Sequence, residues 1–232
     1  MLRVSFRREL QDVLDELVRM MGMARTAMHQ ATEALLEADV QLADSVIAAD
    51  AELDDLREET DARAVSLLAL QAPVATDLRS IVTAMRISSD IERMGDLARH
   101  VAKVARMRFP DQAVPEEVED VFRSMGESAE QICRAAEEAL ASLDGLAAHE
   151  IEQLDDDLDD AHRELFDRLL QQEWSHGTTA AVDTTLLSRY YERFGDHAVS
   201  VARRVRFLVT ADSADLADRP TDPSRVPPEE PV

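Results

Sequence analysis

The sequence has a single cysteine, Cys133, and only six glycines and eight prolines among its 232 residues. One cysteine excludes an intrachain disulfide and a thiolate metal cluster built within one chain. No uncharged apolar run approaches the ~18 residues that a membrane span needs, and the first residues show no signal-peptide pattern. We therefore expect a cytoplasmic protein that does not insert directly into the membrane.

Positive charge is also scarce. The chain carries 48 acidic residues against 25 lysines and arginines, which gives a formal net charge of −23. Such a surface repels phosphate backbones, so it excludes non-specific binding of nucleic acid. Multivalent cations and basic protein surfaces are the partners that this charge favours.

With few turn-forming residues and many Ala, Leu, Glu, Asp and Arg, the composition indicates long helices. Apolar residues recur three and four positions apart, as on helices with one buried stripe. The predicted helices run from about Val4 to Leu36, Gln41 to Leu70, Pro73 to Arg108, Glu116 to Leu143, Leu146 to Gln172 and Thr179 to Thr210. The stripe of the second comprises Leu42, Val46, Ala49, Leu53, Leu56, Ala64 and Leu67. Short connections between such helices favour an antiparallel bundle.

The chain contains a long internal repeat. Glu92-Arg93-Met94-Gly95-Asp96 returns 100 residues later as Glu192-Arg193-Phe194-Gly195-Asp196, and eight of fifteen positions agree between 92–106 and 192–206. A repeat of this length indicates one helical unit written twice. We predict an all-α fold of two tandem three-helix units, residues 1–110 and 115–211. A disordered, acidic, proline-rich tail at 212–232 should follow.

Two pairs of carboxylates lie in the repeated segments. Residues four apart lie on the same face of a helix, so Glu92 neighbours Asp96 and Glu192 neighbours Asp196. The apolar stripe of each helix lies nearly opposite these acids, which predicts that the pairs face outward and form a surface site. Gly95 and Gly195 are unfavourable inside helices, and their position beside the acids suggests close approach of another helix or of a ligand.

The preceding helix of each unit offers further acids, Asp50 with Asp54 and Asp155 with Asp159. Two such helices side by side would gather four carboxylates per unit. Like charges this close destabilise the fold unless a cation or protons intervene. Carboxylate oxygens suit magnesium, calcium, manganese or iron ions. Metal binding is one interpretation; the other is an ordinary solvated acidic face.

Histidines contribute little to this pattern. His162 follows Asp159 at the acid-x-x-His spacing of di-iron bundles, but those bundles need two such motifs and this sequence has one. We therefore expect His162 to be exposed or to cap a helix, and His197 to be a partly exposed helix residue.

The two glutamate-arginine-x-glycine-aspartate segments, together with Leu68-Ala69-Leu70-Gln71-Ala72-Pro73-Val74-Ala75-Thr76-Asp77-Leu78-Arg79, resemble the signature of the PhoU family over about residues 1–210. The resemblance implies two three-helix bundles related by pseudo-twofold symmetry. It also implies surface clusters of divalent or trivalent metal ions such as iron, zinc, manganese or magnesium. The implied ligands are Glu92, Asp96, Glu192 and Asp196, with Asp50, Asp54, Asp155 and Asp159.

The same resemblance implies a non-enzymatic function. A protein of this family would restrain phosphate uptake and phosphate-starvation signalling. Its expected partners are the ATPase subunit of a phosphate ABC transporter and a phosphate sensor histidine kinase, and a homodimer is expected. Two alternatives remain open: a metal-independent acidic helical adaptor, and a di-metal carboxylate bundle enzyme.

Overall fold

The computed structural model describes residues 2–71, 73, 76–170 and 174–211. The described ranges contain helices and no strand: α1 (Leu2–Leu36), α2 (Val40–Gln71), α3 (Thr76–Arg108), α4 (Glu116–Ser142), α5 (Ala148–Leu170) and α6 (Gly177–Thr210). These bounds confirm the predicted helices closely. The start of the third is the exception, since Pro73 precedes α3 instead of opening it. The predicted disordered tail, 212–232, lies outside the described residues.

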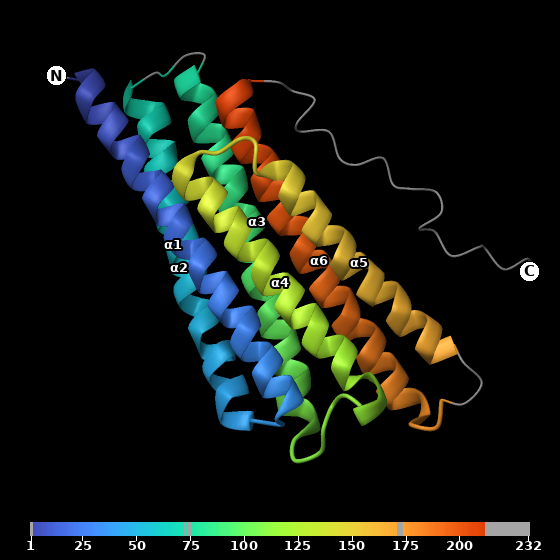
Figure 1. Ribbon diagram of the computed structural model, residues 1–232. Coiled ribbons are helices and arrows are strands. Elements are labelled where there is room, and N and C mark those ends of the chain that lie inside the picture. The colour runs from blue at the N-terminus through green and yellow to red at the C-terminus, as the bar shows by residue number, and fades with distance from the viewer. Residues whose placement is uncertain (1, 72, 74–75, 171–173, 212–232) are drawn as a thin grey trace, which may run out of the picture.

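The axes of the helices α1 to α6 are roughly aligned, so the helices form one elongated bundle (Figure 1). Helices α1, α2 and α3 pack on one another as the first three-helix unit, and α4, α5 and α6 pack as the second. Between the units, α1 contacts α4 and α3 contacts α6. These pairs join equivalent helices of the repeat, which is the pattern that a twofold axis between the units produces. The all-α fold with pseudo-twofold symmetry is therefore confirmed.

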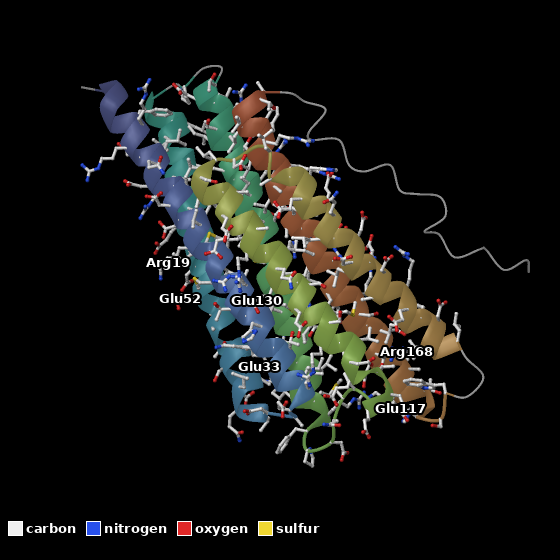
Figure 2. All side chains as sticks on the ribbon, viewed as in Figure 1. Arg19, Glu33, Glu52, Glu117, Glu130 and Arg168 are labelled. Atoms are coloured by element: carbon white, nitrogen blue, oxygen red, sulfur yellow. The ribbon has the colours of Figure 1, made fainter. Side chains whose placement is uncertain are left out.

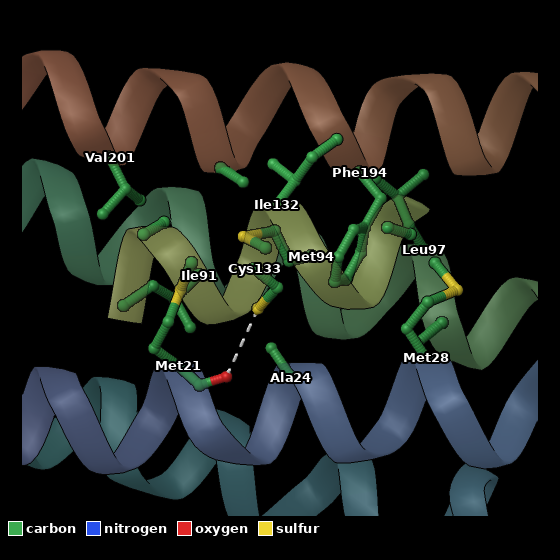
Figure 3. Close-up of a cluster of buried hydrophobic side chains, with 14 of the residues drawn as sticks. Met21, Ala24, Met28, Ile91, Met94, Leu97, Ile132, Cys133, Phe194 and Val201 are labelled. Atoms are coloured by element: carbon green, nitrogen blue, oxygen red, sulfur yellow. Dashed lines mark hydrogen bonds between the residues drawn. The ribbon is translucent and has the colours of Figure 1, made fainter. Parts of the chain in front are cut away.

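One hydrophobic core serves both units. Met21 of α1, Met94 of α3, Ile132 of α4 and Phe194 of α6 point into the same interior (Figure 3), and each is fully buried. Cys133 lies among them, where its thiol donates to the backbone carbonyl of Met21 over 3.7 Å, and burial raises the pKa of this thiol. Since this apolar interior is continuous, the two units share one hydrophobic core and neither has a separate core of its own.

The stripes predicted on α3 and α6 are buried as expected. They comprise Ile87, Ile91, Met94, Ala98, Val101 and Ala105, and Leu187, Tyr191, Phe194, Ala198, Val201 and Val205. The stripe predicted on α2 is wrong at one position. Ala49 is exposed, and the neighbouring Asp50 is buried at 8% exposure. Because α2 packs against both α1 and α3, its buried surface extends to the side on which Asp50 lies.

Ion pairs between neighbouring helices lie on the outer surface of the bundle. Arg19 of α1 reaches Glu52 of α2 at 2.9 Å (Figure 2), and Arg168 of α5 reaches Asp120 of α4 at 2.8 Å. Exposed pairs of this kind contribute only about 0–1 kcal/mol each, so burial of the apolar stripes holds the fold together. Among the described helices, none combines the length and the apolar character that crossing a bilayer requires.

Candidate functional site: two acidic clusters

The first acidic cluster, formed by Asp50, Asp54, Glu92 and Asp96, lies where α2 packs against α3. Its centre is the side chain of Arg99, whose Nη1 lies 2.5 Å from Asp50 Oδ2. The same guanidinium pairs with Asp96, three residues earlier on α3. Arg99 therefore bridges two of the predicted site residues that come from different helices.

The acids of the first cluster influence one another. Burial raises the pKa of the Asp50 carboxyl; the positive charge of Arg99 opposes this rise, and the charges of Asp54 and Asp96 add to it. Glu92 lies one turn before Asp96 on α3, and Arg93 contacts both, at 3.6 Å and 3.2 Å. The structure thus brings the acids of α2 and α3 together and supplies arginines from α3 itself.

The second acidic cluster, formed by Asp155, Asp159, Glu192 and Asp196, lies where α5 packs against α6. Asp155 and Asp159 are buried, with 3% and 7% of their surfaces exposed. Burial raises the pKa of Glu192 to about 7; Arg189 opposes this rise, and the charges of Asp196 and Asp159 add to it. Asp159 and Asp196 therefore lie within electrostatic reach of Glu192, so acids of both helices converge here too.

The prediction that the repeated acid pairs face outward is wrong for three of the four residues. The side chains of Glu92, Asp96 and Glu192 are only 16–19% exposed, and Asp196 alone is exposed. The prediction assumed that each helix has one buried apolar face and that the opposite face, which carries the acids, is exposed to solvent. In the structure α3 contacts α1, α2 and α6, so the flank that carries the acids lies against the neighbouring helix.

The two glycines of the repeat explain how the helices come so close. A Cβ atom on Gly195 would lie 2.6 Å from Asp155 Oδ1 and 2.8 Å from Leu158 Cδ2, and a Cβ on Gly95 would collide with Leu53. Contacts under about 3 Å are not tolerated in a packed interior. Both glycines therefore permit close helix packing, which confirms the first of the two roles that the sequence suggested.

The run of aspartates on α5 takes one defined register. Asp155 and Asp159, the two that the sequence proposed as ligands, are buried, whereas Asp156, Asp157 and Asp160 are exposed. A spacing of four keeps two acids on one helix face, and the apolar contact of Leu158 beside Gly195 sets which face that is.

His162 and His197 contact residues outside the two acidic clusters. His162 is half-buried, contradicting the expectation of an exposed or capping residue: its Nδ1 lies 3.1 Å from Ser188 Oγ, and its ring meets Phe166 edge-on. Burial lowers the pKa of His162 to about 4, with Arg189 and Arg163 adding to the effect. His197 is partly exposed, as expected, and its Nδ1 lies 3.2 Å from Asp90 of α3.

Sequence reasoning missed Arg99 and Asp90. Asp90 accepts a hydrogen bond from Arg204 Nε at 2.6 Å, besides its contact with His197, and so links α3 to α6. Asp90 has no signal in the repeat, because its counterpart is Tyr190. Arg99 does have a signal in the sequence. It lies three positions after Asp96, on the same helix face, and it is a position at which the two copies of the repeat differ, since its counterpart is Val199.

The clusters have the right donor chemistry for hard metal ions. Among the described side chains, no three histidines, cysteines, aspartates or glutamates already form a metal-ligating group. The second cluster nevertheless offers carboxylates from two helices, Asp155 and Asp159 from α5 and Glu192 and Asp196 from α6. Carboxylate oxygens gathered in this way suit Mg²⁺, Mn²⁺ or iron, so the residues of the second cluster fit such an ion.

Comparison with protein families gives one match over both units. The family described as "PhoU domain" matches residues 17–105 and again residues 122–205. The two matched ranges carry the first and the second acidic cluster, so the internal repeat corresponds to two copies of one family domain.

Similar proteins agree with this match. The chain is 49% identical over 209 residues to "Phosphate-specific transport system accessory protein PhoU homolog 2" of Mycobacterium tuberculosis, covering 90% of this chain and 98% of that protein. It is 46% identical to homolog 1 of Mycobacterium leprae, covering 90% and 94%. The crystal structure of PhoU from Pseudomonas aeruginosa superposes with a TM-score of 0.81 at 28% identity, covering 89% of this chain and all of that one.

Proposed function

Since the chain belongs to the PhoU family, we propose that it is a regulator of phosphate transport and not an enzyme. In this role it restrains phosphate uptake and phosphate-starvation signalling when phosphate is plentiful. The observation that carries the proposal is the near-complete overlap with relatives named phosphate-specific transport system accessory proteins, one of them 49% identical to this chain.

The proposed action is docking on other proteins. Its partners would be the ATPase subunit of the phosphate ABC transporter and a phosphate sensor histidine kinase, both met at the cytoplasmic face of the membrane. A net charge of −23 favours a basic surface on the partner, because complementary charge speeds encounter and fixes orientation. We also propose that the chain acts as a homodimer.

Metal ions form the second part of the proposal. The second acidic cluster would hold an ion such as Mn²⁺, Mg²⁺, Zn²⁺ or iron through Asp155, Asp159, Glu192 and Asp196. Burial of Asp155 and Asp159 supports this role, because neutralising converging carboxylates stabilises them. The ion would supply positive charge at the contact between α5 and α6, where it could set the surface that a partner meets.

The experiment that tests the proposal measures uptake of radiolabelled phosphate in the source bacterium with the gene deleted and restored. Deletion should raise uptake at high external phosphate, and the restored gene should lower it again. Copurification of the tagged chain with the transporter ATPase, compared at high and low phosphate, tests docking directly. Unchanged uptake together with no copurification would refute the proposed regulation.

A metal-independent acidic adaptor is the second candidate, and Arg99 favours it for the first cluster, where a protein cation already pairs with two acids. The variant Glu92→Gln, Asp96→Asn, Glu192→Gln, Asp196→Asn separates the two candidates. If this variant loses both bound metal and regulation of phosphate uptake, regulation depends on metal. If it still regulates phosphate uptake, the metal-independent adaptor is the correct function.

A di-metal carboxylate enzyme fits the described residues poorly. Such enzymes carry acid and histidine ligands inside the bundle. Here the core shared by the two units is apolar, and His162 contacts Ser188 and Phe166. Assay of the purified chain for oxygen-dependent turnover with iron bound would test this alternative.

A further inference from the structure

The two acidic clusters occupy equivalent places in the repeat, but they differ at one position close to the acids. Residue 99 of α3 is arginine, and its counterpart on α6, residue 199, is valine. The acids themselves are repeated in type at Asp50 and Asp155, Glu92 and Glu192, and Asp96 and Asp196. The difference therefore concerns the positive charge that accompanies the acids.

In the first cluster the protein supplies that charge itself. The Arg99 guanidinium lies between Asp50 and Asp96, with Nη1 2.5 Å from Asp50 Oδ2. Only 6% of the Asp50 side chain and 28% of the Arg99 side chain are exposed. Charge-assisted hydrogen bonds of this kind are about twice as strong as neutral ones, and removing one partner of a buried pair is costly. Arg99 is therefore firmly held.

In the second cluster, residue 199 cannot form the bridge that Arg99 forms in the first. Val199 is buried and carries no charge. Arg189 pairs with Glu192 from the same helix, three residues earlier, and more than half of the Arg189 side chain is exposed. This pair joins two residues of one helix, whereas Arg99 bridges acids of two helices. Arg203, the counterpart of Lys103, donates from Nε to Glu152 Oε1 at 2.9 Å.

We propose that Arg99 takes the place of a metal ion in the first acidic cluster, so that metal bound by this chain is confined to the second cluster. This inference rests on the proposed metal binding and specifies which half of the molecule performs it. The two halves are then different: in one, Arg99 permanently bridges acids of two helices, and the other responds to the supply of metal.

The physical reason is competition for the same oxygens. A divalent ion entering the first cluster would meet a guanidinium already bonded to Asp50 and Asp96, and like charges at a few ångströms repel. It would have to expel Arg99 from a contact that bridges two helices. At the second cluster the residue in that place is Val199, which neither binds carboxylates nor repels cations.

Exchange of the two residues tests the proposal, with Mn²⁺ alone as the probe because it prefers carboxylate ligands. Wild type, Arg99→Val and Val199→Arg are dialysed against Mn²⁺, and Mn²⁺ per chain is counted by plasma mass spectrometry. Arg99→Val should double the count by opening the first cluster. Val199→Arg should weaken binding by at least about tenfold, because the introduced guanidinium repels the ion and competes for its carboxylates.

Two further variants secure the result. Arg99→Gln removes the charge but keeps much of the side chain, and it replaces Arg99→Val if circular dichroism shows that the latter does not fold. Asp50→Asn combined with Asp96→Asn should leave the wild-type Mn²⁺ count unchanged. A lowered count in that double variant, or an unchanged count in both folded Arg99 variants, would overturn the proposal.

The design also separates this inference from the proposed metal binding. If the wild type takes up no Mn²⁺, metal binding by the native chain is refuted. The Arg99 variants then decide the inference alone. A new site dependent on Asp50 and Asp96 supports Arg99 as the replacement for a metal ion, and no new site overturns it.

Discussion

Tyr191 of α6 and Thr32 of α1 share a hydrogen bond in the middle of the core, with 2.8 Å between their hydroxyl oxygens. Thr32 Oγ1 donates its one proton to the backbone carbonyl of Met28, so the Tyr191 hydroxyl is the donor to Thr32. Tyr191 is fully buried. The bond joins the last helix of the second unit to the first helix of the first unit.

Loss of this bond should weaken the connection between the units. Tyr191→Phe should lower the free energy of unfolding by about 1 kcal/mol, the usual net value of one hydrogen bond. Thr32→Val should also be destabilising, and the double variant should lose less than the sum of the two. Urea unfolding of the four proteins measures this cycle, and strictly additive losses would contradict the bond.

Because α5 packs closely on α6 at Gly195, adding a single methyl group at this position should lower the free energy of unfolding. Gly195→Ala places Cβ 2.6 Å from Asp155 Oδ1 and 2.8 Å from Leu158 Cδ2. Overpacking of this kind costs about 1–3 kcal/mol, more than the ~1 kcal/mol that alanine gains over glycine in a helix. The unfolding midpoint in urea should therefore fall.

Gly22→Ala is the matched control. Its Cβ would meet only the carboxylate end of Glu137, at 3.2 Å, and a flexible side chain can move aside. This variant should be neutral or more stable than the wild type. Equal losses at Gly22 and Gly195 would argue against close packing as the cause.

The raised pKa of Glu192, about 7 against an ordinary value of 4.5, predicts a pH-dependent stability. Between these values the folded state holds more protons than the unfolded state, so the free energy of unfolding falls as pH rises from 4.5 to 7. Glu192→Gln removes this loss. In EDTA at pH 8 the variant should exceed the wild type by about 1 kcal/mol, allowing for solvent screening.

The comparison at pH 4 serves as the internal control, because Glu192 is then protonated in both states and the difference should vanish. Glu92→Gln at the equivalent position should give no gain at pH 8, because Arg93 and Arg99 both supply positive charge to the first cluster. Guanidinium unfolding across this pH range measures both. A Glu192→Gln advantage that persisted at pH 4 would assign the gain to packing instead of charge.

His162 predicts the opposite pH dependence. Its pKa of about 4 lies below the ordinary 6.5, so between these values the unfolded state binds more protons. Stability contributed by neutral His162 is complete above pH 6.5 and is lost as pH falls through about 4. His162→Gln should therefore flatten the stability profile in this window by about 1–2 kcal/mol, allowing for partial exposure. An unchanged slope would show that other groups cause it.

Most of the fold could be predicted from the sequence. The six helices and their stripes follow from the spacing of apolar residues, because helix geometry brings residues three and four apart to one face. The repeat around Gly95 and Gly195 predicted two equivalent units and the convergence of acids from neighbouring helices. These features are local or periodic, so each can be recognised from the residues of a short stretch of chain.

The environment of the acids was decided by the tertiary structure. A single helix shows that Glu92 and Asp96 share a face, but only the packing of α2 on α3 buries Asp50 in place of Ala49 and turns that face inward. The contact of Arg99 with Asp50 joins residues of different helices, which no spacing on one helix predicts. The sequence by itself determined the helices, the repeat and the types of ligand; the packing of neighbouring helices decided burial and the partner of each charge, because both depend on which surfaces meet.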